Sequence, residues 1–446
     1  MTSAVTAVPD PALAAGAGEN RHAEVPHGTG ASPGTMTAGA LGNMLEWYDF
    51  GVYGFFATLF AQNFFPASDP LAGLLAAFGV FAASFLMRPI GGIVFGHVGD
   101  RYGRSVALYV SAGMMTLSTV AIGLLPTYAT IGEAAPLALL GLRLLQGLSI
   151  GGEYSMSAIF LAESAPPRRR GLVTSLAGCG VGGGTLIGSG TAALTASLMS
   201  PEDLAAWGWR LPFLAGIVLG GATLVLRRAA LAHPAPRKPI DEARGLPFVA
   251  ALREDGRAML HAMVLNLALG SGFYVLFVYL TTFMQQVDRF TAAEALRVNT
   301  LAMLGLLVML PLFAGLSDII GRKKVIVGAL AGMVMFTWPL FRLINGGDPQ
   351  QVLLGQLGFA VLTAAYSGSI PATLAEMFRP ATRCSALCFA YNLPLGLVGG
   401  TAPMVAVYLV DRQHDPMGPA VYLIGIALLS LLAALALKDR TGTALN

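Results

Sequence analysis

Charge is scarce in this chain of 446 residues. Only 11% of its residues are Asp, Glu, Lys or Arg, against roughly 25% in a soluble domain, while 55% are hydrophobic. The mean hydropathy is +0.67. A chain with so few charges cannot cover its surface with polar groups in water, so the composition predicts a polytopic membrane protein. The net charge of +3 gives no reason to expect a nucleic-acid partner.

Cysteine and the usual marks of catalysis are scarce as well. The three cysteines, Cys179, Cys384 and Cys388, lie in or near apolar stretches without metal-ligand spacing. We interpret them as small buried residues rather than as a disulfide framework. The chain has no His/Asp cluster, no exposed nucleophile motif and no nucleotide-binding loop. We therefore predict neither an enzyme nor an ATP-driven pump, and we expect no cofactor and no metal site.

Long apolar stretches follow an N-terminal segment, 1–35, that is rich in Ala, Pro, Gly and Thr and that we predict to be a disordered tail. Each stretch is long enough to cross a hydrocarbon layer of about 30 Å. The predicted transmembrane spans are 36–62, 71–95, 105–126, 135–162, 171–199, 209–228, 259–285, 296–314, 325–344, 351–375, 384–410 and 419–437. The predicted fold class is thus an all-α membrane protein with 12 transmembrane helices.

The polar stretch between spans 2 and 3 returns between spans 8 and 9. Four positions agree without a gap, namely Phe95, Asp100, Gly103 and Arg104 with Phe313, Asp318, Gly321 and Arg322. A Glu and an Arg seven residues apart also repeat, as Glu163 with Arg170 and Glu376 with Arg383. This repeat predicts two pseudo-symmetric six-helix bundles, 36–228 and 259–437, joined by a linker over 229–258 and followed by a tail over 438–446.

The basic residues predict the orientation in the membrane. Alternate loops, the linker and both termini hold most of the 27 Lys and Arg residues. The opposite loops hold only Arg210, Arg289, Arg297, Arg342 and Arg412. Because short cytoplasmic loops carry an excess of Lys and Arg, we expect both termini in the cytoplasm.

A few charged residues fall inside the predicted spans, where an unpaired charge is costly and a functional role is expected. Asp49 in span 1 and Arg143 in span 4 fall at matching depths in the middle of the bilayer, so we expect them to be in contact. Glu46 lies on the face of Asp49, and Glu153 lies nearer the cytoplasmic end of span 4. We predict that Asp49 carries a proton under the control of Arg143, with Glu46 and then Glu153 as alternative carriers. The alternative is a structural ion pair that only holds span 1 to span 4.

The stretch Asp100-Arg-Tyr-Gly-Arg104, with its degenerate copy after span 8, resembles the signature of the major facilitator superfamily of transporters. In that superfamily such loops form a charge relay that latches the cytoplasmic side shut. The alternative is an ordinary cytoplasmic turn. The resemblance implies a cytoplasmic gate made by Gly96, Asp100, Arg101, Gly103, Arg104, Glu163, Arg170, Asp318, Gly321, Arg322, Glu376 and Arg383.

Four further motifs are similar to the metabolite:proton symporter branch, which includes bacterial transporters of proline and betaine, α-ketoglutarate, citrate and shikimate. They are Glu46-Trp-Tyr-Asp-Phe50, Arg88-Pro-Ile-Gly-Gly92, the run from Arg143 to Tyr154, and Trp207-Gly-Trp-Arg-Leu-Pro-Phe213. The resemblance implies a monomer in the bacterial inner membrane that imports a small metabolite together with a proton. Two departures stand out: the second-half loop has Ile319 in place of its first arginine, and span 5 has no basic residue, which argues against a dicarboxylate.

Arg88 predicts a substrate with at least one carboxylate, because a guanidinium can bind a carboxylate with two hydrogen bonds. Such a substrate is a small organic acid or a zwitterion such as proline or betaine. Alternatively, Arg88 pairs with Glu46 or Glu153 and does not contact substrate. Further candidate binding residues are Trp47, Tyr53, Tyr154, Tyr274, Tyr366, Tyr391 and Asn392, although such side chains often only bridge helices. A facilitative uniporter or exchanger without proton coupling is the competing function.

Overall fold

The computed structural model describes residues 33–66, 69–102, 104–151, 153–231, 247–380, 382–413 and 415–445. It is almost entirely helical in these ranges. The first half contains α1 Pro33–Phe55, α2 Ala57–Phe64, α3 Pro70–Leu86, α4 Arg88–Tyr102, α5 Arg104–Leu124, α6 Tyr128–Ile131, α7 Ala134–Ser149, α8 Glu153–Ser164, α9 Arg170–Leu198, α10 Pro201–Asp203 and α11 Arg210–Leu231. The second contains α12 Pro247–Tyr274, α13 Leu280–Gln286, α14 Ala292–Ile320, α15 Arg322–Ile344, α16 Pro349–Met377, α17 Arg383–Pro394, α18 Ala402–Gln413 and α19 Gly418–Leu435.

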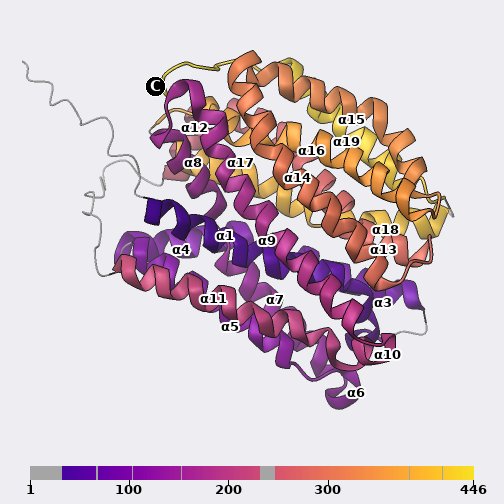
Figure 1. Cartoon of the computed structure of the whole chain (residues 1–446). Helices are drawn as coiled ribbons and strands as arrows, with labels where there is room; N and C mark the ends of the chain where they lie inside the picture. The colour runs from indigo at the N-terminus through magenta and orange to yellow at the C-terminus, as the bar shows by residue number, and fades with distance from the viewer. Residues whose placement is uncertain are drawn as a thin grey trace, which may run out of the picture.

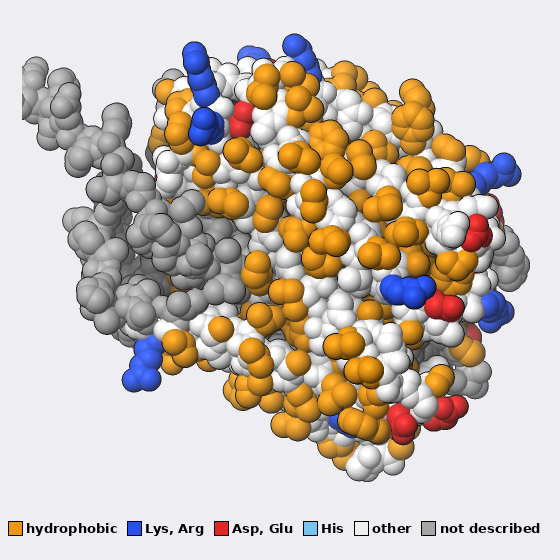
Figure 2. Space-filling view, in the orientation of Figure 1, with side chains coloured by type: hydrophobic (Ala, Val, Ile, Leu, Met, Phe, Trp, Pro, Cys, Tyr) orange, Lys and Arg blue, Asp and Glu red, His pale blue; other side chains and the backbone are white. Residues whose placement is uncertain are grey.

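The predicted all-helical membrane architecture is confirmed. Within the described ranges, 10 helices are long and apolar enough to cross a membrane, or 11 if the bent pair Pro201–Gly208 and Arg210–Val225 forms one span. Hydrophobic side chains cover most of the described face in Figure 2, and charged side chains lie mainly toward its edges. This distribution suits a surface that faces lipid.

The helix ends differ from two of the expected boundaries, those of the N-terminal tail and of the linker. The tail over 1–35 falls almost wholly outside the described residues, and α1 begins at Pro33. The linker was expected over 229–258, but α11 runs to Leu231 and α12 already begins at Pro247, so much of the expected linker is helical. Pro247 suits this position because proline is tolerated in the first turn of a helix. Residues 232–246 lie outside the described part of the chain.

Several helices begin where the sequence supplies a cap. Asp69 accepts a hydrogen bond from the backbone N–H of Leu71 at 3.0 Å, ahead of Pro70 at the start of α3. Thr291 and Glu294 form a reciprocal capping box at the start of α14. These side chains satisfy backbone donors that the first turn of a helix leaves without partners, and so they fix where each span begins.

Helices α9 and α14 run side by side where the two halves meet (Figure 1). Two π-helical turns lie near this boundary. Turn η5, Val275–Tyr279, joins α12 to α13 and packs on α1, while η6, Leu395–Gly399, follows α17 and packs on α3. A π-helical turn interrupts the regular hydrogen-bond ladder and is often found at functional sites.

The spans of α3–α4 and α7–α8 contact each other through their backbones. A Cβ atom on Gly147 would lie 1.9 Å from the carbonyl oxygen of Ser84, and one on Gly151 would lie 2.5 Å from that of Arg88. Real Cβ atoms do not approach so closely, so these two positions require glycine. The contact fixes the spans that carry Arg88 and Arg143 at a set separation.

Gly147→Ala should therefore destabilise the fold by about 1–3 kcal/mol, the usual cost of overpacking a core. Gly141→Ala is the matched control because Gly141 lies in the same helix and a Cβ atom added there would have no neighbouring atom within 4 Å. Alanine is a better helix former than glycine, so the control should keep or raise the melting temperature. Thermal unfolding of both purified variants in detergent measures the difference, and equal melting temperatures would contradict the close-contact argument.

Candidate functional site

The core of the first half holds a buried ion pair between α1 and α7. Arg143 Nη1 lies 2.6 Å from Asp49 Oδ2, and both side chains are fully buried. The ring of Tyr53 lies 3.9 Å from the guanidinium carbon of Arg143, and that of Phe50 lies 5.3 Å from it. The contact predicted from the depths of Asp49 and Arg143 is therefore present. Its role in proton coupling stays a prediction.

A polar chain that sequence reasoning missed continues from this pair. Arg143 Nη1 also donates to Gln146 Oε1 at 2.8 Å, and Gln146 Nε2 donates to Thr119 Oγ1 at 3.0 Å. The available signal was the three-residue spacing of Arg143 and Gln146, which places both on one face of a helix. No comparable signal pointed to Thr119, which reaches the chain from α5.

A second buried ion pair lies about one helical turn from the first. Arg88 Nη2 donates to Glu46 Oε1 at 2.9 Å, and both side chains are buried. The guanidinium carbon of Arg88 lies 4.2 Å from the ring centre of Phe85, 5.3 Å from that of Phe50 and 5.5 Å from that of Trp47. The aromatic faces attract the positive charge. Arg88 thus makes the pairing that the sequence left open as an alternative to substrate contact.

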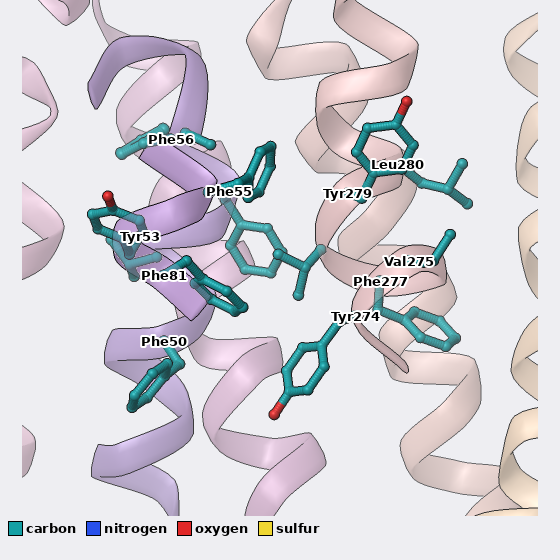
Figure 3. Packing of buried hydrophobic residues seen from close by; sticks show 14 of the residues in the cluster. Phe50, Tyr53, Phe55, Phe56, Phe81, Tyr274, Val275, Phe277, Tyr279 and Leu280 are labelled. Carbon is teal, nitrogen blue, oxygen red and sulfur yellow. The ribbon is translucent and has the colours of Figure 1, made fainter. Parts of the chain in front are cut away.

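Aromatic side chains of the two halves meet beside Arg88. The rings of Trp47 and Tyr274 are stacked at 6.0 Å, and Phe85 contacts Tyr274 edge-on at 4.9 Å. Figure 3 shows Tyr274 on one side of this boundary and Phe50 and Phe81 on the other. Within the described ranges, the Trp47 Nε1, the Tyr274 hydroxyl and the Asn43 amide are buried without a hydrogen-bond partner. Such atoms require an explanation, and a bound polar ligand is one.

A small cavity of about 10 Å³ adjoins Glu46, and the residues that line it all belong to the first half. Glu46 and Glu153 both line it, together with Ser111, Ser149 and Thr223. A space of this size holds roughly one water molecule. The structure thus places two of the predicted proton carriers around one water-sized space.

The other predicted binding residues are distributed between the boundary and the helix interiors. Tyr154 and Tyr391 stack at 4.6 Å across the two halves. By contrast, the hydroxyl of Tyr53 donates to Ala77, that of Tyr366 donates to Leu265, and the amide of Asn392 donates to Cys388. The first two bonds join neighbouring helices of one half, and the third lies within α17. The geometry thus places Trp47 and Tyr274 beside Arg88 and the Tyr154–Tyr391 stack between the halves, whereas Tyr53 and Tyr366 bridge helices within one half.

The halves are also joined at the end of the molecule where α14 begins. Ser189 of α9 bonds to Thr300 of α14 at 2.7 Å and accepts from Asn299 at 3.2 Å. Gln356 donates to Asn299 at 2.7 Å. Sequence reasoning did not predict this bridge, because Ser and Thr are common in apolar helices.

In the nearby loop after α13, burial raises the pKa of the Asp288 carboxyl to about 6.

At the opposite end, a cluster of charged side chains joins the halves, because each half supplies an arginine that pairs with a glutamate of the other half. Arg170 Nη1 lies 2.5 Å from Glu376 Oε1, and Arg383 Nη1 lies 2.8 Å from Glu163 Oε1. Each arginine therefore pairs with the glutamate of the other half. Arg322 adds two hydrogen bonds to Glu376, at 2.7 and 2.9 Å. We call Glu163, Arg170, Asp318, Arg322, Glu376 and Arg383 the gate cluster, after the role predicted for them, which stays a prediction.

Asp318 closes the cluster by capping a helix of the other half. Its carboxylate accepts hydrogen bonds from the backbone N–H groups of Gly171 at 2.8 Å and Leu172 at 2.9 Å, at the start of α9. A Cβ on Gly171 would lie 2.8 Å from the carbonyl oxygen of Ala314, so the close approach requires glycine there. A helix N-terminus favours a carboxylate, which makes this contact a specific link between α9 and α14.

The segment after α19 covers the gate cluster, which the sequence did not predict. Arg170 donates to the carbonyl oxygen of Thr443 at 3.2 Å, and the backbone N–H of Arg322 donates to Thr441 at 3.0 Å. Arg440 donates to the carbonyl oxygen of Glu376 at 2.7 Å. The segment thus bonds to both halves.

The first copy of the loop cannot be compared with the second. Gly103 and the side chains of Asp100, Arg101 and Arg104 lie outside the described residues, and at Gly96 only the helical backbone is described. Their predicted part in the gate stays a prediction. Gly321 of the second copy is described and has φ of 104°, a conformation that favours glycine.

Comparison with known proteins gives one consistent result. The family model described as sugar (and other) transporter matches residues 35–230 and 246–437. The glycine betaine/proline/ectoine/pipecolic acid transporter OusA of Dickeya dadantii is 36% identical over 415 residues, which cover 91% of this chain and 83% of that protein. The proline/betaine transporter of Salmonella typhimurium is 35% identical over the same shares, and the putative proline/betaine transporter of Staphylococcus aureus is 34% identical over 89% and 86%.

Solved structures share the fold. The proton:xylose symporter XylE, of the major facilitator superfamily, bound to 6-bromo-6-deoxy-D-glucose matches with a TM-score of 0.73 and 19% identity, over 92% of this chain and 97% of that chain. The inward open conformation of the xylose transporter XylE from Escherichia coli matches with a TM-score of 0.70 and 18% identity over the same shares.

The gate cluster yields a test. Glu376→Gln removes the carboxylate that two buried arginines share, so the contact between the halves at this end should weaken while the aromatic boundary stays intact. Flux of any transported solute through reconstituted protein should fall at least about tenfold, whereas the dissociation constant should change by less than about threefold. Glu202→Gln, an exposed acid at the other end, is the control. A parallel loss of flux and affinity would show that the cluster does more than gate.

Proposed function

The chain belongs to the sugar (and other) transporter family, within the major facilitator superfamily, and is a multi-pass membrane transporter rather than an enzyme. From that premise we propose that it imports a small zwitterion bearing a carboxylate, such as proline or a betaine, together with a proton. In this proposal it acts by alternating access, as a monomer in the bacterial inner membrane with both termini in the cytoplasm. The observation that carries the proposal is the pair of buried ion pairs on α1, next to polar atoms of Trp47 and Tyr274 that have no partner in the described ranges.

Asp49 is the proposed proton carrier. When ionised, it holds α1 against α7 through Arg143. When Asp49 takes up a proton, the attraction between Asp49 and Arg143 is weakened. Helices α1 and α7 can then repack toward the conformation in which the transporter opens to the opposite side of the membrane. If the repacked state also binds substrate better, proton and substrate each strengthen the binding of the other, as linkage requires. Glu46, and after it Glu153, are the alternative carriers, since both line the water-sized cavity.

The surroundings of Arg88 fit a zwitterion. A substrate carboxylate would compete with Glu46 for the guanidinium, with the same two-pronged geometry that Arg offers to any carboxylate. The rings of Trp47, Phe85 and Tyr274 would then face the ammonium group, because aromatic faces attract cations. The names of the relatives, which include proline, glycine betaine, ectoine and pipecolic acid, support this substrate class.

Facilitated diffusion or exchange of the same solutes is the alternative function. The deciding experiment is uptake of labelled glycine betaine and proline into proteoliposomes with an imposed pH gradient, acidic outside. Concentrative uptake that a protonophore abolishes supports the symporter. Downhill flux that is the same with and without the pH gradient supports the facilitator.

Asp49→Asn should separate binding from coupling, because asparagine resembles the protonated acid and cannot titrate. The variant should bind substrate and exchange labelled for unlabelled substrate across the membrane, but internal and external concentrations should only equalise under a pH gradient. Accumulation against a concentration gradient by this variant would transfer the proposed role to Glu46. Asp203→Asn, an exposed acid outside the ion pairs, is the control.

Arg88→Lys should distinguish carboxylate recognition from structural pairing with Glu46. Lysine keeps the positive charge but lacks the two parallel N–H donors of a guanidinium. The affinity for glycine betaine should therefore fall about tenfold, as expected for loss of a hydrogen bond to a charged group. Choline has the same trimethylammonium group without the carboxylate, so any binding of choline should change little. Ligand-induced thermal shifts measure both. If glycine betaine binds the variant as tightly as the original protein, Arg88 does not recognise its carboxylate.

A further inference from the structure

Gln146 is fully buried beside the Asp49–Arg143 pair. Its Oε1 accepts from Arg143 Nη1 at 2.8 Å, and the same nitrogen donates to Asp49 Oδ2 at 2.6 Å. Gln146 Nε2 donates to Thr119 Oγ1 at 3.0 Å, and the Thr119 hydroxyl donates to the carbonyl oxygen of Met115 at 2.9 Å. Asp49 and Gln146 thus accept from the same nitrogen of the arginine, which carries two N–H groups.

This chain of hydrogen bonds has a fixed direction. A hydroxyl has one proton, and that of Thr119 is committed to Met115. Its oxygen is left to accept, and the NH₂ group of Gln146 is the partner that donates to it. The amide oxygen must therefore face Arg143. A flipped amide would lose both bonds and would present a donor to a cation.

A buried guanidinium needs acceptors, since an uncompensated charge in an apolar interior is strongly unfavourable. While Asp49 is ionised, it supplies charge and Gln146 supplies a second acceptor. When Asp49 becomes neutral, the amide oxygen of Gln146 remains. Gln146 does not titrate, so it remains an acceptor in both protonation states, but its bond to Arg143 contributes more when Asp49 is neutral, because the charge of Asp49 then no longer compensates the guanidinium.

We propose that Gln146, oriented by Thr119, is a positioning residue for proton coupling that supplies an acceptor to the buried Arg143 guanidinium and fixes its orientation on α7 while Asp49 is protonated. The inference rests on the proposed function, because it takes Asp49 as the proton carrier. It follows that Gln146 lowers the proton concentration at which uptake is half-maximal. It also leaves Arg143 in place to re-form the ion pair when the proton is released.

The groups around Asp49 are few in the described part of the chain. Arg143 of α7 is the charged side chain in contact with it, and Tyr48 and Tyr53 of α1 are the titratable side chains close to the pair. The hydroxyl of Tyr48 donates to the carbonyl oxygen of Pro212, and that of Tyr53 donates to Ala77. These hydroxyls are thus directed at backbone oxygens, while the Gln146 oxygen is directed at Arg143.

The test measures initial uptake of labelled glycine betaine into proteoliposomes at fixed internal pH and varied external pH. Gln146→Leu removes the acceptor, and Thr119→Val removes the hydroxyl that orients it. Gln146→Leu should raise the proton concentration for half-maximal uptake about tenfold, as loss of a hydrogen bond to a charged group implies, with a much smaller change in maximal rate. Thr119→Val should shift it in the same direction by less, and Thr119→Ser should restore the original proton requirement.

Thr116→Val is the matched control. Thr116 lies one turn earlier on α5, and its hydroxyl donates to Ala112 in the way that of Thr119 donates to Met115. The control should need the same proton concentration as the original protein. If Gln146→Leu does not fold, the pair Thr119→Val and Thr119→Ser decides alone.

Three results would overturn the inference. Unchanged proton requirements in both Gln146→Leu and Thr119→Val, in a protein that still couples uptake to protons, would overturn it while the proposed function stands. So would an equal loss of rate without a shift in proton requirement, since that indicates a merely structural role. If the original protein accumulates neither glycine betaine nor proline on a pH gradient, the proposed function fails and the inference fails with it.

Discussion

The contact between Asp49 and Arg143 is the constraint on which the arrangement of the first half depends. A lone charge is costly in the apolar core of a membrane protein, so each ionised group there must keep a partner. The same rule governs Glu46 with Arg88 and the gate cluster. A transporter that obeys it can change conformation only by exchanging partners, or by adding or removing a proton. This makes buried ion pairs suitable as switches, although they contribute little net stability compared with apolar packing.

Interactions within one half were largely predictable from the sequence, and those between the halves were not. Helix rise alone placed Asp49 opposite Arg143, because both positions could be counted from the ends of their spans. The internal repeat located Glu163, Arg170, Glu376 and Arg383, but it gave no means to see that each arginine pairs with the glutamate of the other half. That pairing depends on the packing of α9 against α16 and of α8 against α17, which bring together residues more than 200 positions apart in the chain.

Small polar residues were the main omission. Thr119, Ser189 and Thr300 have no sequence signal of their own, since serine and threonine occur widely in apolar helices, and the one signal for Gln146 is its three-residue spacing from Arg143. Tyr366 shows the converse: a tyrosine in an apolar span suggested a binding residue, but its hydroxyl bonds to the backbone of a neighbouring helix. Hydrogen-bond direction, which depends on tertiary contacts, separates these two cases.

The contacts of the segment that follows α19 carry an entropic cost. Its bonds to Arg170, Arg322 and Glu376 exist only while Asp439 to Thr443 hold one conformation. Fixing the backbone of a residue costs roughly 1–2 kcal/mol of conformational entropy near room temperature. Forming these contacts at this end of the molecule therefore includes an ordering cost that grows with temperature.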